Sequence, residues 1–148
     1  MSTYTQIIYQ IVFSTSKRAP SLHHENRPEL FKYISGIIKN QKRHLYQING
    51  VEDHLHIVTH LHPTVALSDF VKDIKVASSI KIKEMGWFKY FTAWQEGYGA
   101  FTYSIKEKDK LIEYVKNQEE HHKKISFRDE FIDLLSEHEI EFDEKYLL

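Results

Sequence analysis

The sequence predicts an α+β fold, with one antiparallel sheet that carries helices on one face and a further helix after the sheet. Segments with strand and helix patterns follow one another in the order strand, helix, strand, strand, helix, strand, which is typical of this class. The 148 residues are 41% apolar and 28% charged and include nine Phe and nine Tyr, enough for one packed core. We therefore expect a single domain over residues 1–148.

The first half of the chain predicts a strand, a helix and a hairpin. Residues 3–13 combine β-branched and aromatic side chains, which favours a buried strand. After a polar loop with two prolines, residues 29–42 place apolar side chains at helical spacing. Residues 44–51 and 54–62 are short β-rich runs separated by Glu52-Asp53, which is a hairpin pattern.

The second half predicts another helix and the last strand. Ser68 can cap a helix over residues 68–85, and Gly86 can end it. Residues 87–103 are aromatic and interrupted by glycines, so we expect a strand framed by loops. The full order is therefore that of a ferredoxin-like or RRM-like sheet.

A helix-start motif follows this sheet. Ser104 and Glu107 have the spacing of a capping box, in which each side chain binds a free backbone N–H of the other residue. We expect this helix to run to about Lys124, and a last short helix over residues 127–138.

Composition limits the chemistry and the compartment. The chain has no cysteine, which excludes disulfides, thiolate nucleophiles and cysteine-bound metals. No apolar run is long enough for a membrane helix, and the N-terminus lacks a secretory pattern. We expect a cytoplasmic protein without a membrane partner.

The net charge of −1 is unevenly distributed. Residues 129–148 hold eight acidic side chains and one lysine, a net of −7, which leaves +6 on the first 128 residues. A body of that charge can hold a basic groove for nucleic acid. From charge alone, an ordinary solvated surface is the simpler explanation.

Two histidines lie at strand spacing in the segment His54-Leu55-His56. Alternate residues of a strand point to the same face, so both imidazoles lie side by side while Leu55 and Ile57 face the core. That arrangement suits two ligands of one divalent metal. A solvated strand face that is merely rich in histidine explains the pattern equally well.

The helix after Ser104 has a polar face beside its apolar stripe. At about 100° per residue, Tyr114, Gln118 and His121 fall within one narrow sector, next to Leu111 and Val115. The simpler interpretation is that Tyr114 edges the core with its hydroxyl in water.

The segment Trp94-Gln-Glu-Gly-Tyr-Gly-Ala-Phe101 combines aromatic rings with glycines. It suits either a stacking platform for unpaired bases or a tight loop that packs under the helix after Ser104. We favour packing.

Taken together, these motifs resemble the single-tyrosine HUH transposases of hairpin-ended insertion sequences, the IS200-like type, and their REP-associated relatives. His54-Leu55-His56 matches the His-hydrophobic-His element, with Glu52-Asp53 where the family usually has Pro-Asp. Tyr114-Val-Lys-Asn-Gln118, followed by His121-His122, matches the tyrosine signature. The segments 94–101 and Phe127-Arg-Asp-Glu130-Phe131 resemble the tryptophan–glycine segment and the usual end of the family pattern.

The resemblance implies a metal-dependent DNA strand transferase and endonuclease that acts in DNA transposition and recombination. Tyr114 would be the catalytic nucleophile and would form a 5′-phosphotyrosine on single-stranded DNA. His54, His56 and Gln118 would bind Mg²⁺ or Mn²⁺, which would polarise the scissile phosphate. His121 and Glu52 are possible additional site residues, because Glu52 adds negative charge beside the histidines.

The resemblance also implies partners. We expect single-stranded DNA with hairpins and a homodimer with composite active sites, in which Tyr114 can act in trans. Basic side chains of the body are weak candidates for phosphate contacts: Lys17, Arg18, Lys39, Lys42, Arg43, Lys72, Lys75, Lys81 and Lys83.

Two alternatives remain open. A domesticated REP-type member would bind or nick repeated hairpins without mobilising its own gene. A non-catalytic metal-binding ferredoxin-like domain would use the histidines for a metal and Tyr114 only at the edge of its core, so Tyr114→Phe would change nothing.

Overall fold

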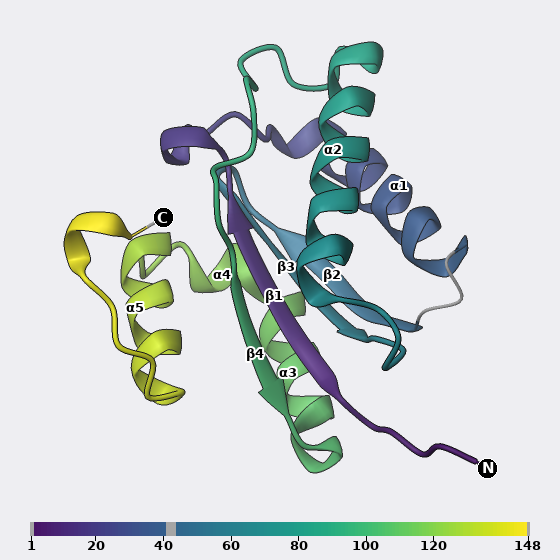
Figure 1. Ribbon diagram of the computed structural model, residues 1–148. Coiled ribbons are helices and arrows are strands. Elements are labelled where there is room, and N and C mark those ends of the chain that lie inside the picture. Colours follow the sequence, from purple (N-terminus) through teal and green to yellow (C-terminus); the bar gives the residue numbers. More distant parts are fainter. Residues whose placement is uncertain (1, 41–43, 148) are drawn as a thin grey trace.

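The computed structural model describes residues 2–40 and 44–147 and contains a four-stranded antiparallel sheet in the order β2-β3-β1-β4 (Figure 1). This confirms the predicted α+β class, including the strand order of a ferredoxin-like sheet. The strands are β1 (Ile8–Ser14), β2 (His44–Gly50), β3 (His54–His60) and β4 (Gly99–Tyr103).

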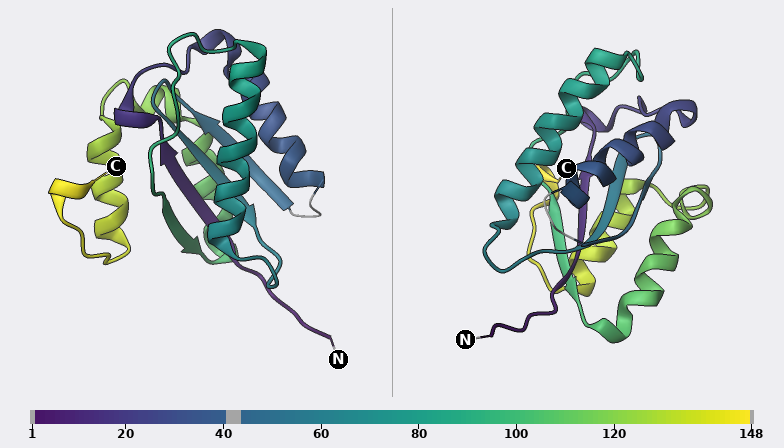
Figure 2. Two further views of the ribbon diagram at one scale, coloured as in Figure 1. Left: turned by 45° about the horizontal axis from the view of Figure 1, so that its top comes forward. Right: turned by 90° about the vertical axis from the view of Figure 1, so that its right-hand side faces the viewer.

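Helices cover both faces of the sheet (Figures 1 and 2). The first two lie on one face, as predicted, and the later three lie on the other. In the described residues, no helix is long and apolar enough to cross a membrane. The helices are α1 (Arg27–Asn40), α2 (Leu67–Met85), α3 (Lys108–Lys116), α4 (Gln118–His121) and α5 (Phe127–Glu137), with short 3₁₀ turns η1 (Ser16–Arg18), η2 (His24–Asn26), η3 (Ile105–Glu107) and η4 (Glu144–Tyr146).

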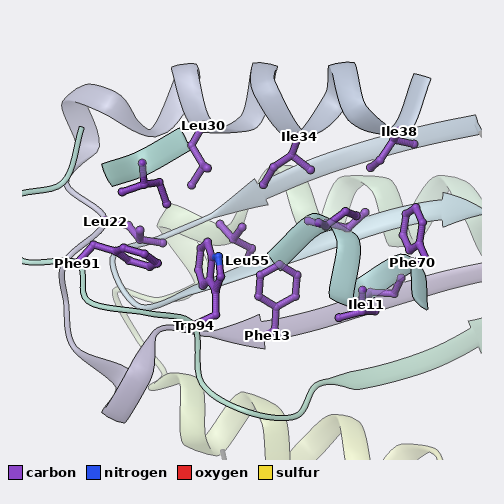
Figure 3. Close-up of a cluster of buried hydrophobic side chains, with 14 of the residues drawn as sticks. Ile11, Phe13, Leu22, Leu30, Ile34, Ile38, Leu55, Phe70, Phe91 and Trp94 are labelled. Atoms are coloured by element: carbon purple, nitrogen blue, oxygen red, sulfur yellow. The ribbon is translucent and has the colours of Figure 1, made fainter. Parts of the chain in front are cut away.

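The main core lies between the sheet and the pair α1 and α2. Figure 3 shows Leu30, Ile34 and Ile38 of α1 pointing toward the strands, where they meet side chains such as Phe13 and Leu55. Because side chains alternate along a strand, the other residues of β1 and β3 face α3, α4 and α5. The main core therefore fixes which face of β3 presents its histidines.

Two smaller apolar clusters hold the later helices on the opposite face. One packs α5 against β1 and β4, and the other packs α3 against β1 and β3. His54 contacts Phe127 of the first cluster, and His56 contacts Tyr114, which packs against the second. The buried members are Val12, Phe101, Phe127, Phe131, Leu134 and Leu135 for the first cluster, and Ile8, Val58, Leu111 and Val115 for the second.

The helix expected from Ser104 to about Lys124 is broken, which corrects the sequence prediction. Its capping box is present, with Glu107 Oε1 accepting from Ser104 N at 3.0 Å. The break falls at Asn117, because Asn49 Nδ2 of β2 donates to the carbonyl oxygens of Val115 and Lys116 at 3.0 Å each. Those carbonyls would otherwise accept the next helical hydrogen bonds. The chain then restarts as α4 in a new direction.

Two predicted strands are shorter than expected. Residues 3–7 lie outside β1, because its pairing with β3 and β4 begins only at Ile8. Of residues 87–103, only Gly99–Tyr103 forms a strand, β4. The remaining predicted elements differ at their ends by at most two residues. The end expected for the first helix, residue 42, lies outside the described residues.

The segment around Trp94 packs, but against α2 and not under the helix after Ser104. The Trp94 ring meets Phe13 edge to face at 5.0 Å, and its Nε1 donates to Ser78 Oγ at 3.0 Å. Lys75 Nζ donates to the carbonyl oxygens of Gln95 and Gly97 at 2.8 and 2.6 Å. Trp94 is therefore part of the main core and not a free stacking surface.

Gly99 allows α5 to approach the sheet closely. A Cβ atom at this position would lie 2.5 Å from Cε1 of Phe131. We expect Gly99→Ala to destabilise the fold by about 1–3 kcal/mol, because the aromatic ring has to shift within a packed cluster. Denaturant unfolding measures this free energy. Gly36→Ala in α1 is the control, since its added Cβ meets nothing within 4 Å, and a loss for Gly99→Ala no larger than for Gly36→Ala would contradict the account.

Candidate active site

A buried cluster of imidazole nitrogens surrounds one carboxylate on the face of the sheet that α3, α4 and α5 cover. Oε1 of Glu130, from α5, lies 3.2 Å from Nε2 of His54, 3.1 Å from Nε2 of His56 and 3.0 Å from Nε2 of His122. His54, His56 and Glu130 are at most 2% exposed. One donor atom from each of the four residues lies within 4.8 Å of the others. The sheet and α5 thus bring together residues that are far apart in the sequence.

The outer nitrogens of the β3 histidines are held by oxygen acceptors. Nδ1 of His54 donates to Asp53 Oδ1 at 2.7 Å, and Nδ1 of His56 donates to Gln10 Oε1 at 2.7 Å. The Gln10 amide is itself oriented, because its Nε2 donates to the Tyr103 hydroxyl at 2.8 Å. Metal-binding histidines characteristically have such partners, since a proton fixed on Nδ1 leaves the Nε2 lone pair for the ion.

His122 is arranged in the same way. Its Nδ1 donates to the carbonyl oxygen of Ile125 at 2.8 Å, so its Nε2 also points into the cluster. Three nitrogens therefore face one carboxylate oxygen of Glu130. A cation between these groups would satisfy their lone pairs together.

Burial and neighbouring groups shift the pKa values of the residues in this cluster. Burial lowers the pKa of His56 to about 4, because the hydrogen bond and charge of Glu130 only partly offset the lost solvation of the charged imidazole. Burial also disfavours charge on His54, but the hydrogen bonds and charges of Asp53 and Glu130 outweigh it and raise the pKa of His54. Burial opposes ionisation of Glu130, yet its close contacts with His122, His54 and His56 lower the pKa of Glu130 below its usual value. Glu130 is therefore a buried anion held among histidines.

The donor set fits a divalent cation. Two ligands that lie about 2.1 Å from one ion at right angles are about 3.0 Å apart, close to the spacing of these nitrogens from Oε1 of Glu130. Gln118 adds an amide oxygen, because its Oε1 lies 3.2 Å from Nε2 of His54. A mixture of imidazole, carboxylate and amide ligands suits Mn²⁺ and, with more oxygen ligands, Mg²⁺.

The Tyr114 hydroxyl lies at the edge of this cluster and donates to Oε2 of Glu130. Its ring centroid is 5.9 Å from that of His56 in the same chain. Burial, followed by the charge of Glu130, raises the pKa of Tyr114 above its usual value of 10. Tyr114 also lines a cleft of about 500 Å³, so its hydroxyl is next to space that a substrate can enter.

The structure brings together His54, His56, Gln118 and Tyr114, the four residues that the sequence analysis placed at the centre of the site. His121 lies at the rim, with its Nε2 3.5 Å from Oε2 of Glu130.

Glu52 is not in the cluster. Its side chain is exposed, and its neighbour Asp53 is the residue that bonds to His54. Glu52 lines a second cleft, of about 400 Å³, on the side of the cluster where His122 lies.

His122 and Glu130 lie within motifs of the sequence, but neither is among the predicted site residues. Glu130 carries a visible signal, because it lies on the same helical face as Phe127, Phe131 and Leu134. A carboxylate on the apolar face of a helix needs a buried partner. His122 has no comparable signal beyond its position next to His121.

The predicted DNA-contacting residues do not gather at this site. Lys39, Lys72, Lys75, Lys81 and Lys83 belong to α1 and α2, across the sheet from the cluster.

The predicted DNA-contacting residues also differ in their surroundings. Lys75 is engaged with the Trp94 segment, while Lys17 and Arg18 are exposed in η1. Lys42 and Arg43 lie outside the described residues.

Comparisons with known proteins identify a family and chains of similar fold. The family model described as "Transposase IS200 like" matches residues 3–118, a span that includes His54, His56, Tyr114 and Gln118. A candidate transposase from Deinococcus radiodurans R1 has a similar fold, with a TM-score of 0.61 and 21% identity over 80% of this chain and 95% of that chain.

A REP-associated tyrosine transposase bound to a REP hairpin is also similar, with a TM-score of 0.54 and 15% identity over 79% of this chain and 72% of that chain. A search of curated proteins returned no match. Because the family match spans most of the residues, this chain belongs to the IS200-like transposase family.

Proposed function

We propose that this chain is a transposase that cleaves and rejoins single-stranded DNA at hairpin-bearing ends, through a 5′-phosphotyrosine on Tyr114. One observation carries the proposal. A tyrosine hydroxyl, two histidines of one strand and a glutamine oxygen converge on one buried cluster, beside a cleft, within one chain. A domain that only binds metal has no need of a tyrosine hydroxyl at that point.

In the proposed reaction, the phosphate is transferred from the DNA strand to Tyr114. The Tyr114 oxygen forms a bond to phosphorus while the bond from phosphorus to the 3′ oxygen breaks. The 3′ oxygen leaves with the bonding electrons and takes up one proton, which balances the proton that Tyr114 loses. The phosphate is conserved on the tyrosine, so a second 3′-hydroxyl can reverse the step and rejoin strands without ATP.

His54, His56 and Gln118 would hold the Mg²⁺ or Mn²⁺ ion. When bound, the ion would supply positive charge to the phosphate oxygens. Hydrogen bonds that His54 Nδ1 donates to Asp53 and His56 Nδ1 donates to Gln10 keep both imidazoles in the tautomer that such an ion requires.

Hairpin DNA is the proposed partner, and the similar REP-associated transposase that is bound to a REP hairpin supports it. The exposed members of the predicted basic set, including Lys17 and Arg18, are proposed contacts to the phosphate backbone.

The test is to incubate the protein with Mn²⁺ and single strands that span both flanks of its own gene. A covalent protein–DNA adduct on a denaturing gel, absent with EDTA, is the expected result. Hairpin binding without an adduct from any flanking strand would contradict the proposed reaction and favour the domesticated binder.

A mixing experiment addresses how the site is assembled. The family resemblance leads us to expect a homodimer with composite sites, whereas the contact of Tyr114 with the cluster of its own chain supports attack in cis. We expect no adduct when His54→Ala and Tyr114→Phe proteins are mixed, because each chain then holds an incomplete site. If the mixture restores adduct formation, Tyr114 acts in trans and the site is composite.

A further inference from the structure

We infer that Glu130 is shared between the metal centre and the nucleophile. One of its carboxylate oxygens is a further ligand of the divalent cation, and the other holds the Tyr114 hydroxyl in place. The inference rests on the proposed function for the role of Tyr114, but its metal-binding half stands independently. Glu130 lies outside the span that the family model matches.

The position of Oε1 supports the role of a ligand. Three Nε2 atoms, from His54, His56 and His122, converge on this oxygen at 3.0 to 3.2 Å. Nδ1 of His56 and of His122 donates outward, so in its neutral form each ring presents a lone pair to the carboxylate. Lone pairs that face one another in a buried site are unfavourable unless a proton or a metal ion lies between them. Oε1 is therefore placed to join the histidines as a ligand.

The position of Oε2 supports the second role. This oxygen accepts hydrogen bonds from the Tyr114 hydroxyl and from Nε2 of Gln118, the latter at 3.0 Å. Gln118 turns its own Oε1 toward His54. Glu130 and Gln118 therefore connect the Tyr114 hydroxyl to the histidines. We expect a change in either residue to move the hydroxyl relative to the ion.

The packing of α5 holds Glu130 rigidly. Phe127, one turn before it, stacks on the His54 ring with centroids 4.2 Å apart and planes 22° apart. Ser126 caps the helix by accepting from Asp129 N at 3.1 Å. Phe131 packs against Phe101 of β4. A carboxylate fixed among histidines in this way is preorganised for an ion and contributes little to a plain apolar core.

Isothermal titration with Mn²⁺ alone tests the ligand role without any DNA. We expect Glu130→Gln, which keeps the shape of the side chain, to bind Mn²⁺ at least about tenfold more weakly than the wild type. Glu130→Asp restores the charge on a shorter side chain, so its affinity is expected to lie between the two. Asp129→Asn, which removes one exposed charge from the neighbouring residue, is the matched control and should bind as the wild type does.

The positioning role needs a second readout. At Mn²⁺ concentrations that saturate Glu130→Gln, the maximal rate of adduct formation should stay below that of the wild type, because the carboxylate no longer holds the hydroxyl. A purely structural role predicts no such residual loss in a variant whose circular dichroism and unfolding midpoint match the wild type. If Glu130→Gln is misfolded, the same comparisons are made with Glu130→Asp.

The outcomes separate this inference from the proposed function. Unchanged Mn²⁺ affinity in a folded Glu130→Gln protein overturns the ligand role, even if the wild type forms adducts. Full adduct rate at saturating Mn²⁺ overturns the positioning role. Weaker Mn²⁺ binding in the variant, with no adduct from the wild type on any strand, supports the ligand role and contradicts the proposed function.

Discussion

Tyr114→Phe is expected to abolish the covalent protein–DNA adduct, a loss of at least about 10⁴-fold in its rate of formation, because the attacking oxygen is removed. The fold should survive, since the ring keeps its place beside Leu111 and Val115, and the change removes only the hydrogen bonds of the hydroxyl, with Glu130 and Gln118. A hydrogen bond to a charged group contributes about 1.5–3 kcal/mol to the free energy of unfolding. Affinity for hairpin DNA should also persist.

Denaturing gels with labelled strands measure this effect. Tyr46→Phe is the matched control, because Tyr46 packs against the same apolar cluster as Tyr114 without entering the polar site. It should form adducts at the wild-type rate. Adducts that persist in Tyr114→Phe would show that another residue is the nucleophile.

Removal of the metal ligands is the second large effect that we expect. In the wild type, Mn²⁺ at about one hundred times its dissociation constant should add about 2.7 kcal/mol to stability. For a domain of this size that raises the melting temperature by about 5–10 °C, and EDTA should reverse it. His54→Ala or His56→Ala should remove most of this shift and all adduct formation.

The comparison with and without Mn²⁺ is made within each variant, because either substitution also removes a partner of buried Glu130 and destabilises the metal-free fold. His60→Ala is the matched control. It belongs to the same strand but bonds to the backbone of Ile7, outside the cluster. A full Mn²⁺ shift in His54→Ala and His56→Ala would place the metal elsewhere.

The histidine pair could be predicted from sequence because a strand alternates strictly between two faces. Once Leu55 and Ile57 are assigned to the core, His54 and His56 have to face the other side. The capping box of Ser104 and Glu107 also depends only on residues close in sequence, so it predicted where the helical segment that carries Tyr114 begins.

Features that depend on distant contacts could not be predicted in this way. The helix breaks at Asn117 because Asn49 of β2 takes two of its carbonyls, and nothing near Asn117 in the sequence shows this. Glu130 is 74 residues from His56, so only the packed fold brings them together.

The sequence also does not indicate which of two neighbouring acidic residues in a turn contacts the site. Glu52 and Asp53 carry the same charge, but the backbone of the turn directs Asp53 to His54 and leaves Glu52 exposed. The number of basic residues likewise does not predict which of them are free to contact DNA. Lys75 was expected at the surface, but its side chain donates hydrogen bonds to the Trp94 segment.

Mass spectrometry of the adduct tests the central claim most directly. After the wild-type protein has reacted with a flanking single strand in Mn²⁺, nuclease and protease digestion leaves a peptide that carries the linked nucleotide. The account predicts a nucleotide joined through its 5′ phosphate to Tyr114. A nucleotide on any other residue, or a 3′-phosphate linkage, would contradict it.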